Sequence, residues 1–266
     1  MISNKKELIV NWLKDYATDT GFKGFVVGLS GGVDSTCSAA LAVQAVGKEN
    51  VFGVLMPCTL GSQKSRSQDI DDAILVAKFL GIDCKVVSLN AAAEEILSAT
   101  DIQVGTNSLL VSNVKARLRA VTLRMYAEQK HYLVLGTTNR TEDLLGYFTK
   151  GGDGGSGVDV EPIATLFKYQ VRDIVRSYGF DEKLANRVPT AGLFDDQTDE
   201  GELGVTYDQL DALFEFMELT NKNIYDFHLT EFAHSHFGFT YAQIKDIQKR
   251  MMSTDHKRKV PPSPTF

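Results

Sequence analysis

The stretch FVVGLSGGVDSTCSAAL, residues 25–41, combines an apolar run, a loop of small residues and a second apolar run. The run Phe25–Leu29 predicts a buried strand, and the small apolar residues after Thr36 predict a helix. A glycine loop between a strand and a helix N-terminus gathers backbone N–H groups at one point, where the helix dipole also favours an anion. The loop Ser30–Thr36 is therefore predicted to bind phosphate.

This loop differs from a Walker A motif. In that motif a Lys precedes the hydroxyl residue, whereas here Asp34 precedes Ser35 and Thr36. An acid beside a bound phosphate is expected when a divalent cation lies between them, because hard cations bind carboxylate and phosphate oxygens together. The alternative is a tight turn in which Ser, Gly and Asp only cap the helix. The intact SGG-x-DS pattern, directly after an apolar strand, favours phosphate binding.

Composition limits the class of protein. The chain has 266 residues, enough for one α/β domain or one domain with an appendage. Its formal charge is −6, which does not favour a nucleic-acid partner. Cys37, Cys58 and Cys84 form no C-x-x-C pair, as expected in a reducing compartment. The N-terminus lacks a signal-peptide pattern and no apolar run reaches membrane-spanning length, so we expect a soluble cytoplasmic protein with no membrane partner.

Short apolar runs alternate with helical patterns through the first part of the chain. After the first strand, we predict strands at Val51–Met56, Asp83–Leu89, Tyr132–Gly136 and Glu161–Ala164. The predicted helices are 3–19, in which Trp12 is expected to pack, and about 67–80, 106–129 and 166–178. This alternation predicts an α/β fold, with a doubly wound, mostly parallel sheet flanked by helices and the loop-bearing strand at its centre.

The C-terminal part has a helical pattern. Helices are predicted at 207–217, 223–237 and 240–251, so we expect a single domain, 1–266, with an α/β core over about 20–190 and a helical part over about 191–266. The acidic run 195–202 favours a solvated or disordered face over a cation site. Because no Cys or Glu lies at metal spacing, His228, His234 and His236 are expected to be surface or core residues.

Polar residues follow the strand at 132–136. The carboxyl ends of parallel strands meet at one edge of a sheet, so Thr137 and Glu142 should lie beside the phosphate loop. Glu142 either caps the helix that begins there or completes a metal site with Asp34. Lys168 lies in the first turn of a predicted helix, where the helix dipole disfavours a cation. An anionic partner would explain that position, although a single surface Lys needs no explanation.

Three further segments carry charge or glycine. The cations of helix 106–129, which are Lys115, Arg117, Arg119 and Arg124, are either solvated or meet an anionic ligand. Gly151–Gly157 has five glycines in seven residues, which predicts a mobile, irregular segment, either a spacer or a lid. The basic tail His256–Pro264 is expected to be disordered and cannot be helical beyond Val260.

Together these parts suggest nucleotidyl transfer. If the loop binds the β- and γ-phosphates while Asp34 and Glu142 hold Mg²⁺, the α-phosphorus faces a second substrate and pyrophosphate is the leaving group. A carboxylate or amide oxygen is the natural nucleophile, because adenylation prepares it for attack by ammonia, sulfur or an amine. No Ser/His/Asp or Cys/His set that could supply a catalytic nucleophile stands out. Positioning of the substrates and stabilisation of charge must therefore accelerate the reaction.

The motifs resemble those of a known family. SGGVDS resembles the signature of the ATP pyrophosphatase (PP-loop) superfamily, whose fold is of the adenine nucleotide alpha hydrolase type. Within it, the chain resembles the ammonia-dependent NAD synthetases. The segments that carry this resemblance are NVKARLR at 113–119, GTTNRTEDLLGYFTKGGDGG at 136–155, PTAGLFDDQTDEGELG at 189–204 and HKRKVPPSP at 256–264.

The resemblance implies a site and a reaction. It implies Mg²⁺ bound by Asp34 and Glu142, which are catalytic together with Lys168, and adenylation of deamido-NAD by ATP before ammonia displaces AMP. The implied ATP contacts are Gly28, Leu29, Ser30, Gly31, Gly32, Val33, Asp34, Ser35, Thr137, Lys168 and Thr190. The implied deamido-NAD contacts are Arg117, Lys150, Asp159 (with Asp153 as the alternative), His256 and Lys257.

The resemblance also bears on assembly and nitrogen source. It implies a homodimer with the long helices in its interface and the deamido-NAD sites across it, and a tail that folds over bound substrates. Glutamine-dependent relatives carry an added amidase domain, for which 266 residues leave no room, so free ammonia is the expected donor unless a separate glutaminase associates. The rival functions are another PP-loop enzyme, such as a tRNA-thiolating protein or a GMP synthetase domain, and a nucleotide sensor without turnover.

Overall fold

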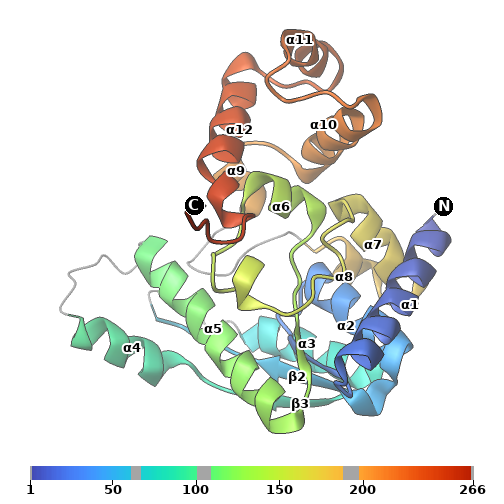
Figure 1. Cartoon of the computed structure of the whole chain (residues 1–266), viewed down its shortest axis with the longest axis vertical. Helices are drawn as coiled ribbons and strands as arrows, with labels where there is room; N and C mark the ends of the chain where they lie inside the picture. Colours follow the sequence, from blue (N-terminus) through green and yellow to red (C-terminus); the bar gives the residue numbers. More distant parts are fainter. Residues whose placement is uncertain (1, 61–66, 101–108, 188–197, 265–266) are drawn as a thin grey trace.

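A computed structural model describes residues 2–60, 67–100, 109–187 and 198–264. Its centre is a four-stranded parallel sheet with the strand order β3-β2-β1-β4 (Figure 1). The strand that carries the phosphate loop, β1, therefore lies inside the sheet, which confirms the predicted arrangement. The strands are β1 (Phe25–Gly28), β2 (Val51–Leu55), β3 (Asp83–Val86) and β4 (Leu133–Leu135).

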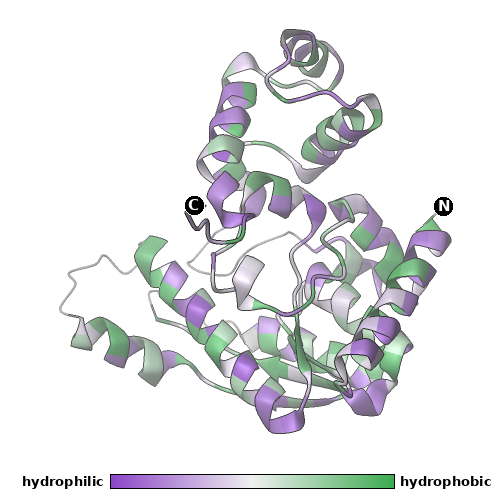
Figure 2. Ribbon diagram, in the orientation of Figure 1, coloured by the Kyte–Doolittle hydropathy of each residue, from purple (hydrophilic) through white to green (hydrophobic). Residues whose placement is uncertain are grey.

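Alternating side chains of the strands pack on opposite faces of the sheet. Phe25 and Val27 join the core under one helical layer, whereas Val26 joins the core under the other. The strands β1, β2 and β4 are apolar and mostly buried, as expected for parallel strands covered on both faces, whereas the edge strand β3 is exposed and carries Asp83 and Lys85. Figure 2 shows the hydropathy of each residue on the same ribbon. The fold is the doubly wound α/β arrangement that the alternating pattern predicts.

Helices cover both faces of the sheet. One face is covered by α1 (Ile2–Thr20), α2 (Val33–Val46), α3 (Ser67–Leu80) and α7 (Lys168–Ser177). The other face is covered by α4 (Asn90–Ala99), which was not predicted from the sequence, and α5 (Leu109–Lys130). The shorter elements of this part of the chain are α6 (Arg140–Leu145), α8 (Glu182–Ala185) and the 3₁₀ turn η1 (Lys48–Asn50).

The C-terminal helices form a second hydrophobic core. They are α9 (Asp199–Leu203), α10 (Tyr207–Thr220), α11 (Phe227–His236) and α12 (Tyr241–Ser253), followed by the 3₁₀ turn η3 (Asp255–Lys257). In Figure 1 they lie above the carboxyl edge of the sheet, next to α6. Leu145 of α6 and Phe167, just before α7, belong to the same core, so these helices are joined to the segments that follow β4.

The expected strand at Glu161–Ala164 is wrong. Pairing beside β4 is limited to one bridge between Leu135 and Val160, after which the chain turns. Pro162 has no N–H group with which to continue a ladder. The backbone N–H of Ala164 instead donates to the carbonyl oxygen of Glu161 at 3.3 Å.

The expectation that Gly151–Gly157 forms no regular structure is also wrong. A bridge between Lys150 and Gly154 closes a tight turn, and the 3₁₀ turn η2 (Gly155–Gly157) follows it. A Cβ atom at Gly157 would lie 2.0 Å from the carbonyl oxygen of Gly152. Glycine therefore permits a close backbone approach in this segment.

Trp12 does not pack as expected. It remains 44% exposed, because the face of α1 that meets the sheet layer carries Val10, Leu13 and Ala17 instead. Trp12 contacts Tyr16, with the ring centroids 5.7 Å apart. In the described part of the chain, no helix combines the length and the apolar character that a membrane span requires.

Two glycines that end helices provide a test of how the C-terminal segment packs. Gly146 and Gly204 both adopt left-handed φ angles, of 61° and 71°. A Cβ at Gly146 would lie 2.3 Å from Cβ of Thr254, whereas no atom lies within 4 Å of a Cβ at Gly204. We expect Gly204→Ala to lower the free energy of unfolding by about 1 kcal/mol and Gly146→Ala by about 2–4 kcal/mol, measured by denaturant titration. Equal losses would show that Thr254 does not constrain this position.

Candidate active site

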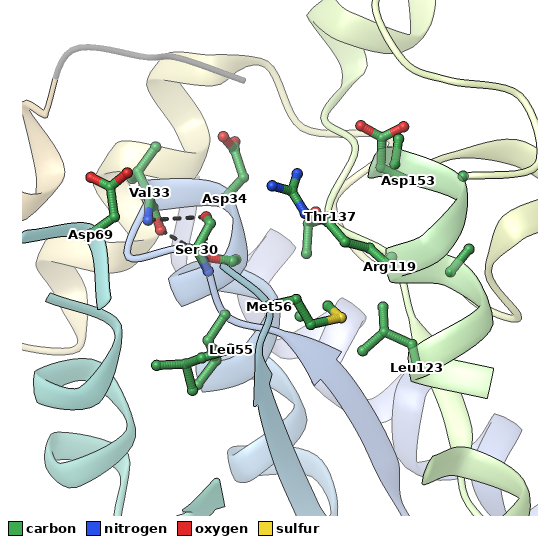
Figure 3. A pocket seen from close by; sticks show the side chains of 18 of the residues that line it. Ser30, Val33, Asp34, Leu55, Met56, Asp69, Arg119, Leu123, Thr137 and Asp153 are labelled. Carbon is green, nitrogen blue, oxygen red and sulfur yellow. Dashed lines mark hydrogen bonds between the residues drawn. The ribbon is translucent and has the colours of Figure 1, made fainter. Parts of the chain in front are cut away.

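A cavity of about 410 Å³ opens where β1, β2 and β4 end (Figure 3). It is lined by the residues that follow each of these strands, including Ser30, Pro57 and Thr137. This placement confirms that the predicted phosphate loop and Thr137 share one edge of the sheet. Leu55, Met56 and Leu123 form an apolar wall, and Asp34 and Thr137 lie on the polar side. A ligand with a flat apolar part and an anionic part suits this division.

The phosphate loop is shaped by its own hydroxyl groups. The backbone N–H of Ser30 donates to Ser35 Oγ at 3.3 Å, and Thr36 Oγ1 donates to the carbonyl oxygen of Gly32 at 2.8 Å. Gly31 adopts a φ of +74°, which favours glycine. Gly32 is the N-cap of α2 and gives the helix no side-chain cap. The N-terminal end of α2 therefore faces the cavity without a capping oxygen of its own.

Asp34, Glu142 and Lys168 form one cluster at the cavity. Lys168 Nζ donates to Asp34 Oδ2 at 2.6 Å and to Glu142 Oε1 at 3.2 Å. The exposed fractions of the three side chains are 2% for Lys168, 19% for Asp34 and 14% for Glu142. The anionic partner predicted for Lys168 is thus a pair of carboxylates from elements far apart in the sequence.

The electrostatics of the cluster follow from burial and from an excess of acid. Burial, with smaller effects of Asp34 and Asp199, raises the pKa of Glu142 to about 7, although Lys168 lowers it. Burial lowers the pKa of Lys168, but Asp34 and Glu142 outweigh that effect and hold it above its ordinary value. Lys168 is therefore a permanent cation among carboxylates that outnumber it.

Asn139 connects the cluster to the end of β4. Its Nδ2 donates to Asp34 Oδ1 at 3.0 Å, and its Oδ1 accepts from the backbone N–H of Glu142 at 3.0 Å. Glu142 Oε2 in turn accepts from the backbone N–H of Asn139 at 3.2 Å, which completes a capping box at the start of α6. Glu142 therefore caps its helix, which is one of the two roles considered for it, while its other oxygen contacts Lys168. Its role in a metal site stays a prediction.

The acidic run 195–202 reaches the cluster from α9. Residues 195–197 lie outside the described part of the chain, but Asp199 is only 5% exposed, so the expectation of a solvated face is wrong for this residue. Tyr207 lies between Asp199 and Glu142, with its hydroxyl 3.1 Å from Asp199 Oδ2 and 3.2 Å from Glu142 Oε1. Burial raises the pKa of Tyr207, which keeps this hydroxyl protonated.

Two arginines line the cavity that are not among the substrate contacts implied by the resemblance, although Arg119 is one of the cations considered on helix 106–129. Arg119 of α5 points its guanidinium group into the cavity in Figure 3, whereas Arg117 is exposed and does not line it. Arg187 donates to the carbonyl oxygen of Gly31 at 2.8 Å and pairs with Asp69 of α3. Helical spacing is the signal that separates Arg119 from Arg117, because Ala116, Ala120 and Leu123 mark the buried face of α5.

The remaining residues implied by the resemblance fall into two sets. Lys150 Nζ donates to the carbonyl oxygen of His256 at 2.9 Å, and Lys257 Nζ donates to that of Phe148 at 2.8 Å, so these basic residues lie together. The first residues of the tail are thus ordered, contrary to the expectation of disorder. Asp159 pairs with Arg124 at 2.6 Å, while Asp153 lines the cavity. Thr190 lies outside the described residues.

Comparison with known proteins gives the family. Residues 6–261 match the family model for NAD synthase. The chain belongs to the NAD synthase family. The NH3-dependent NAD+ synthetase of Methanococcoides burtonii is 38% identical to it, over 98% of this chain and 94% of that relative. The corresponding protein of Thermococcus kodakarensis is 37% identical, over 98% and 96% of the two chains.

Solved structures of the NAD synthase fold agree with the arrangement described above. The NMN synthetase from Francisella tularensis is 31% identical, with a TM-score of 0.84 and coverage of 100% of this chain and 99% of that one. The NH3-dependent NAD synthetase from Campylobacter jejuni has a TM-score of 0.78 over 100% and 99% of the two chains. At 23% identity, the latter likeness supports the fold alone.

The cluster has donors that suit a small hard cation. Asp34 and Glu142 each place a carboxylate oxygen on the same Lys168 ammonium group, so they converge on a single positive charge. In the described residues, no group of three or more His, Cys, Asp or Glu side chains is placed to hold a metal ion. Two carboxylates fit Mg²⁺ if phosphate oxygens and water complete its octahedron.

Removing the central cation should destabilise the fold. Lys168→Met would leave the carboxylates of Asp34 and Glu142 facing each other with little solvent, so we expect it to lower the free energy of unfolding by about 3 kcal/mol in metal-free buffer. Denaturant titration measures this loss. Lys183→Met, at an exposed position on α8, is the control and should have no measurable effect. Equal stability of the two variants would mean that the buried cation does not hold the cluster together.

Proposed function

We propose that this protein is a ligase that makes NAD from deamido-NAD, ATP and ammonia, with release of AMP and pyrophosphate. The observation that carries the proposal is the convergence of Asp34 and Glu142 beside the uncapped N-terminus of α2, within the cavity. Two carboxylates next to an anion-binding helix end suit a metal–triphosphate better than an uncomplexed anion. The names of the closely related proteins supply the substrate class.

The triphosphate of ATP is proposed to lie on the phosphate loop. Its β- and γ-phosphates would accept hydrogen bonds from backbone N–H groups at the start of α2, and its adenine would lie against the apolar wall of Leu55, Met56 and Leu123. Asp34 and Glu142 would hold Mg²⁺, which neutralises charge that develops on pyrophosphate as it departs. Lys168 and Arg119 both line the cavity and add fixed positive charge to it.

The chemistry then has two steps. A carboxylate oxygen of deamido-NAD attacks the α-phosphorus of ATP. The bond from that phosphorus to the oxygen between the α- and β-phosphates breaks, and pyrophosphate leaves. The nitrogen of ammonia next attacks the acyl carbon. AMP departs with the former carboxylate oxygen that joined the acyl carbon to phosphorus, and the nitrogen loses a proton to give the amide. The protein's contribution is to align the carboxylate with the α-phosphorus and to keep the charges of the first step compensated.

The deamido-NAD contacts are proposed from the resemblance together with the placement of the residues. Lys150, His256 and Lys257 already lie together near the cavity, which suits a phosphate-rich substrate. Because Asp153 lines the cavity and Asp159 is held by Arg124, we favour Asp153 over Asp159 for the contact with the nicotinate half. We also expect the enzyme to work in the cytoplasm, where ATP is supplied.

A second substrate is suggested by one solved structure. The NMN synthetase from Francisella tularensis resembles this chain over its full length, at 31% identity. Its name indicates amidation of a mononucleotide, so nicotinate mononucleotide is the second candidate. The chemistry at the carboxylate is the same for both substrates, and the difference lies in whether an adenylate half is also bound.

The reaction can be tested with both substrates side by side. The protein is incubated with ATP, Mg²⁺ and ammonium, together with deamido-NAD or nicotinate mononucleotide, and AMP, pyrophosphate and the amide products are followed. We expect deamido-NAD to give the higher kcat/KM. A higher value for nicotinate mononucleotide would favour the second candidate, and no substrate-dependent pyrophosphate with either would contradict the proposal.

Asp34→Ala tests the role of the cluster in the same assay. We expect turnover to fall by at least about 100-fold, because the variant loses a carboxylate that binds the metal and aligns the triphosphate. The fold should persist, as judged by circular dichroism. Glu182→Ala, at an exposed position that is not among the described residues lining the cavity, should keep full activity. Unchanged turnover in Asp34→Ala would remove this residue from the site.

We further propose that the protein is a homodimer. Val121 and Met125 are 58% and 66% exposed on α5, and they share a face of that helix with Arg117, four residues earlier. Exposed apolar side chains that gather on one face of a helix can mark a protein interface. Arg117 would then contact deamido-NAD bound to the second subunit, which is why it need not line the cavity of its own chain.

Sedimentation velocity tests the dimer. We expect a dimer for the unmodified protein and a shift to monomer for the double variant Val121→Asp with Met125→Asp, because two carboxylates in an apolar interface lose their hydration. Leu219→Asp is the matched control, since Leu219 is 80% exposed on α10. A monomer before mutation, or a dimer that both variants leave intact, would contradict this proposal.

A further inference from the structure

Helix α10 directs two buried polar side chains toward the cluster. Tyr207 and Asp211 lie four residues apart, which places them on one face of the helix, and their exposed fractions are 0% and 2%. The other buried side chains of α10 are apolar: Leu210, Leu213 and Phe214. Burying a polar group costs free energy unless it is hydrogen bonded, so the partners of Tyr207 and Asp211 indicate what these residues do.

Tyr207 contacts both kinds of charge in the cluster. Its hydroxyl lies between Glu142 and Asp199, and its ring lies under Lys168, whose Nζ is 4.6 Å from the ring centroid. A hydroxyl has one proton, so it can donate to only one of the two carboxylates at a time. The Tyr207 hydroxyl therefore fixes the position of Glu142 Oε1, although the carboxylate of Asp199 is close to it.

Asp211 contacts the backbone that carries the cluster. Its Oδ2 accepts from the backbone N–H of Tyr169 at 2.9 Å, in the first turn of α7, directly after Lys168. Its Oδ1 accepts from the hydroxyl of Thr141, the residue before Glu142 on α6. A carboxylate at a helix N-terminus is favoured by the helix dipole. One side chain thus joins the first turns of α6 and α7.

We propose that α10 positions the catalytic cluster, with Tyr207 orienting the carboxylate of Glu142 and Asp211 holding the first turns of α6 and α7 at the spacing that brings Glu142 and Lys168 together. Neither Tyr207 nor Asp211 is among the described residues that line the cavity, so both act through their neighbours. The inference rests on the roles proposed above for Glu142 and Lys168. It makes the helical C-terminal part a functional component of the site.

A purely structural role for these residues predicts a different result. If α10 only fills space beside α6 and α7, removing the Tyr207 hydroxyl changes the unfolding midpoint and leaves cation binding alone. Partners of metal-binding side chains affect the metal itself, and their loss typically weakens metal affinity by about 10- to 100-fold. The affinity for Mg²⁺ therefore separates positioning from packing.

The main experiment compares two Tyr→Phe variants. Mg²⁺ is titrated by calorimetry into protein saturated with α,β-methylene-ATP, which cannot release pyrophosphate. We expect Tyr207→Phe to raise the Kd for Mg²⁺ about 10-fold or more. Tyr169→Phe is the matched control, because the Tyr169 hydroxyl also bonds a carboxylate of α10, Glu215, at 2.7 Å but does not contact Glu142. It should keep the Kd within about twofold.

A second variant keeps the test decisive if Tyr207→Phe folds poorly. Asp211→Asn preserves the volume of the side chain but has one acceptor oxygen in place of two, so either Thr141 or the backbone of Tyr169 loses its partner. We expect it to raise the Kd for Mg²⁺ and also the Kd for α,β-methylene-ATP measured without metal, because Lys168 is displaced. Asp208→Asn, at an exposed position on the same helix, should change neither.

The outcome is independent of the pyridine substrate. Unchanged Mg²⁺ affinity in Tyr207→Phe, or in Asp211→Asn where only that variant folds, would overturn the positioning role even if the unfolding midpoint falls. No deamido-NAD is present in the titration, so a protein that amidates a different acid would still give the expected shifts. Failure of Mg²⁺ and the ATP analogue to bind the unmodified protein would instead contradict the proposed function.

Discussion

The structure depends on one ammonium group, that of Lys168, held between the carboxylates of Asp34 and Glu142. Isolated charges of this kind are costly to bury, and a Lys that is 2% exposed is tolerated because both acids lie within hydrogen-bonding distance. The three residues come from α2, α6 and α7. The surrounding fold brings the N-terminal ends of these three helices to one point.

The parallel sheet supplies this convergence. Because β1 and β4 are neighbours and run in the same direction, the segments that follow them, which carry Asp34 and Glu142, leave the sheet at the same edge. The bridge at Val160 returns the chain to β4, and α7 then begins at Lys168 beside that edge. The C-terminal helices complete the surroundings of the cluster, because Tyr207 on α10 contacts both Glu142 and Asp199 on α9.

Local patterns in the sequence predict much of this arrangement. The apolar run before SGGVDS and the later apolar runs give the parallel sheet, and the rule on strand ends places Thr137 and Glu142 at the cavity. The unfavourable position of Lys168 in its helix indicates an anionic partner, and the structure provides two. These predictions work because they depend on spacing within a few residues or on a general rule of α/β topology.

The features that the sequence does not reveal depend on contacts between distant segments. Helical spacing puts Arg119 on the buried face of α5, but only the packing of that helix on the sheet brings this face to the cavity. Asp199 belongs to an acidic run that is typical of solvated chain, and it is buried in contact with Tyr207 of α10 and with Tyr147. The pairing of Asp159 with Arg124 also joins segments that are distant in the sequence. The strand expected at Glu161–Ala164 fails for a local reason instead, because Pro162 has no N–H group for a ladder.

The central claim is that the cluster serves attack of a substrate carboxylate on the α-phosphorus of ATP. Deamido-NAD labelled with ¹⁸O in its nicotinate carboxylate tests this most directly, with AMP and inorganic products analysed by mass spectrometry after complete conversion in the presence of ammonium. The account predicts one ¹⁸O atom in each AMP and none in pyrophosphate. Unlabelled AMP, or label in inorganic phosphate as expected for attack at the γ-phosphorus, would contradict it.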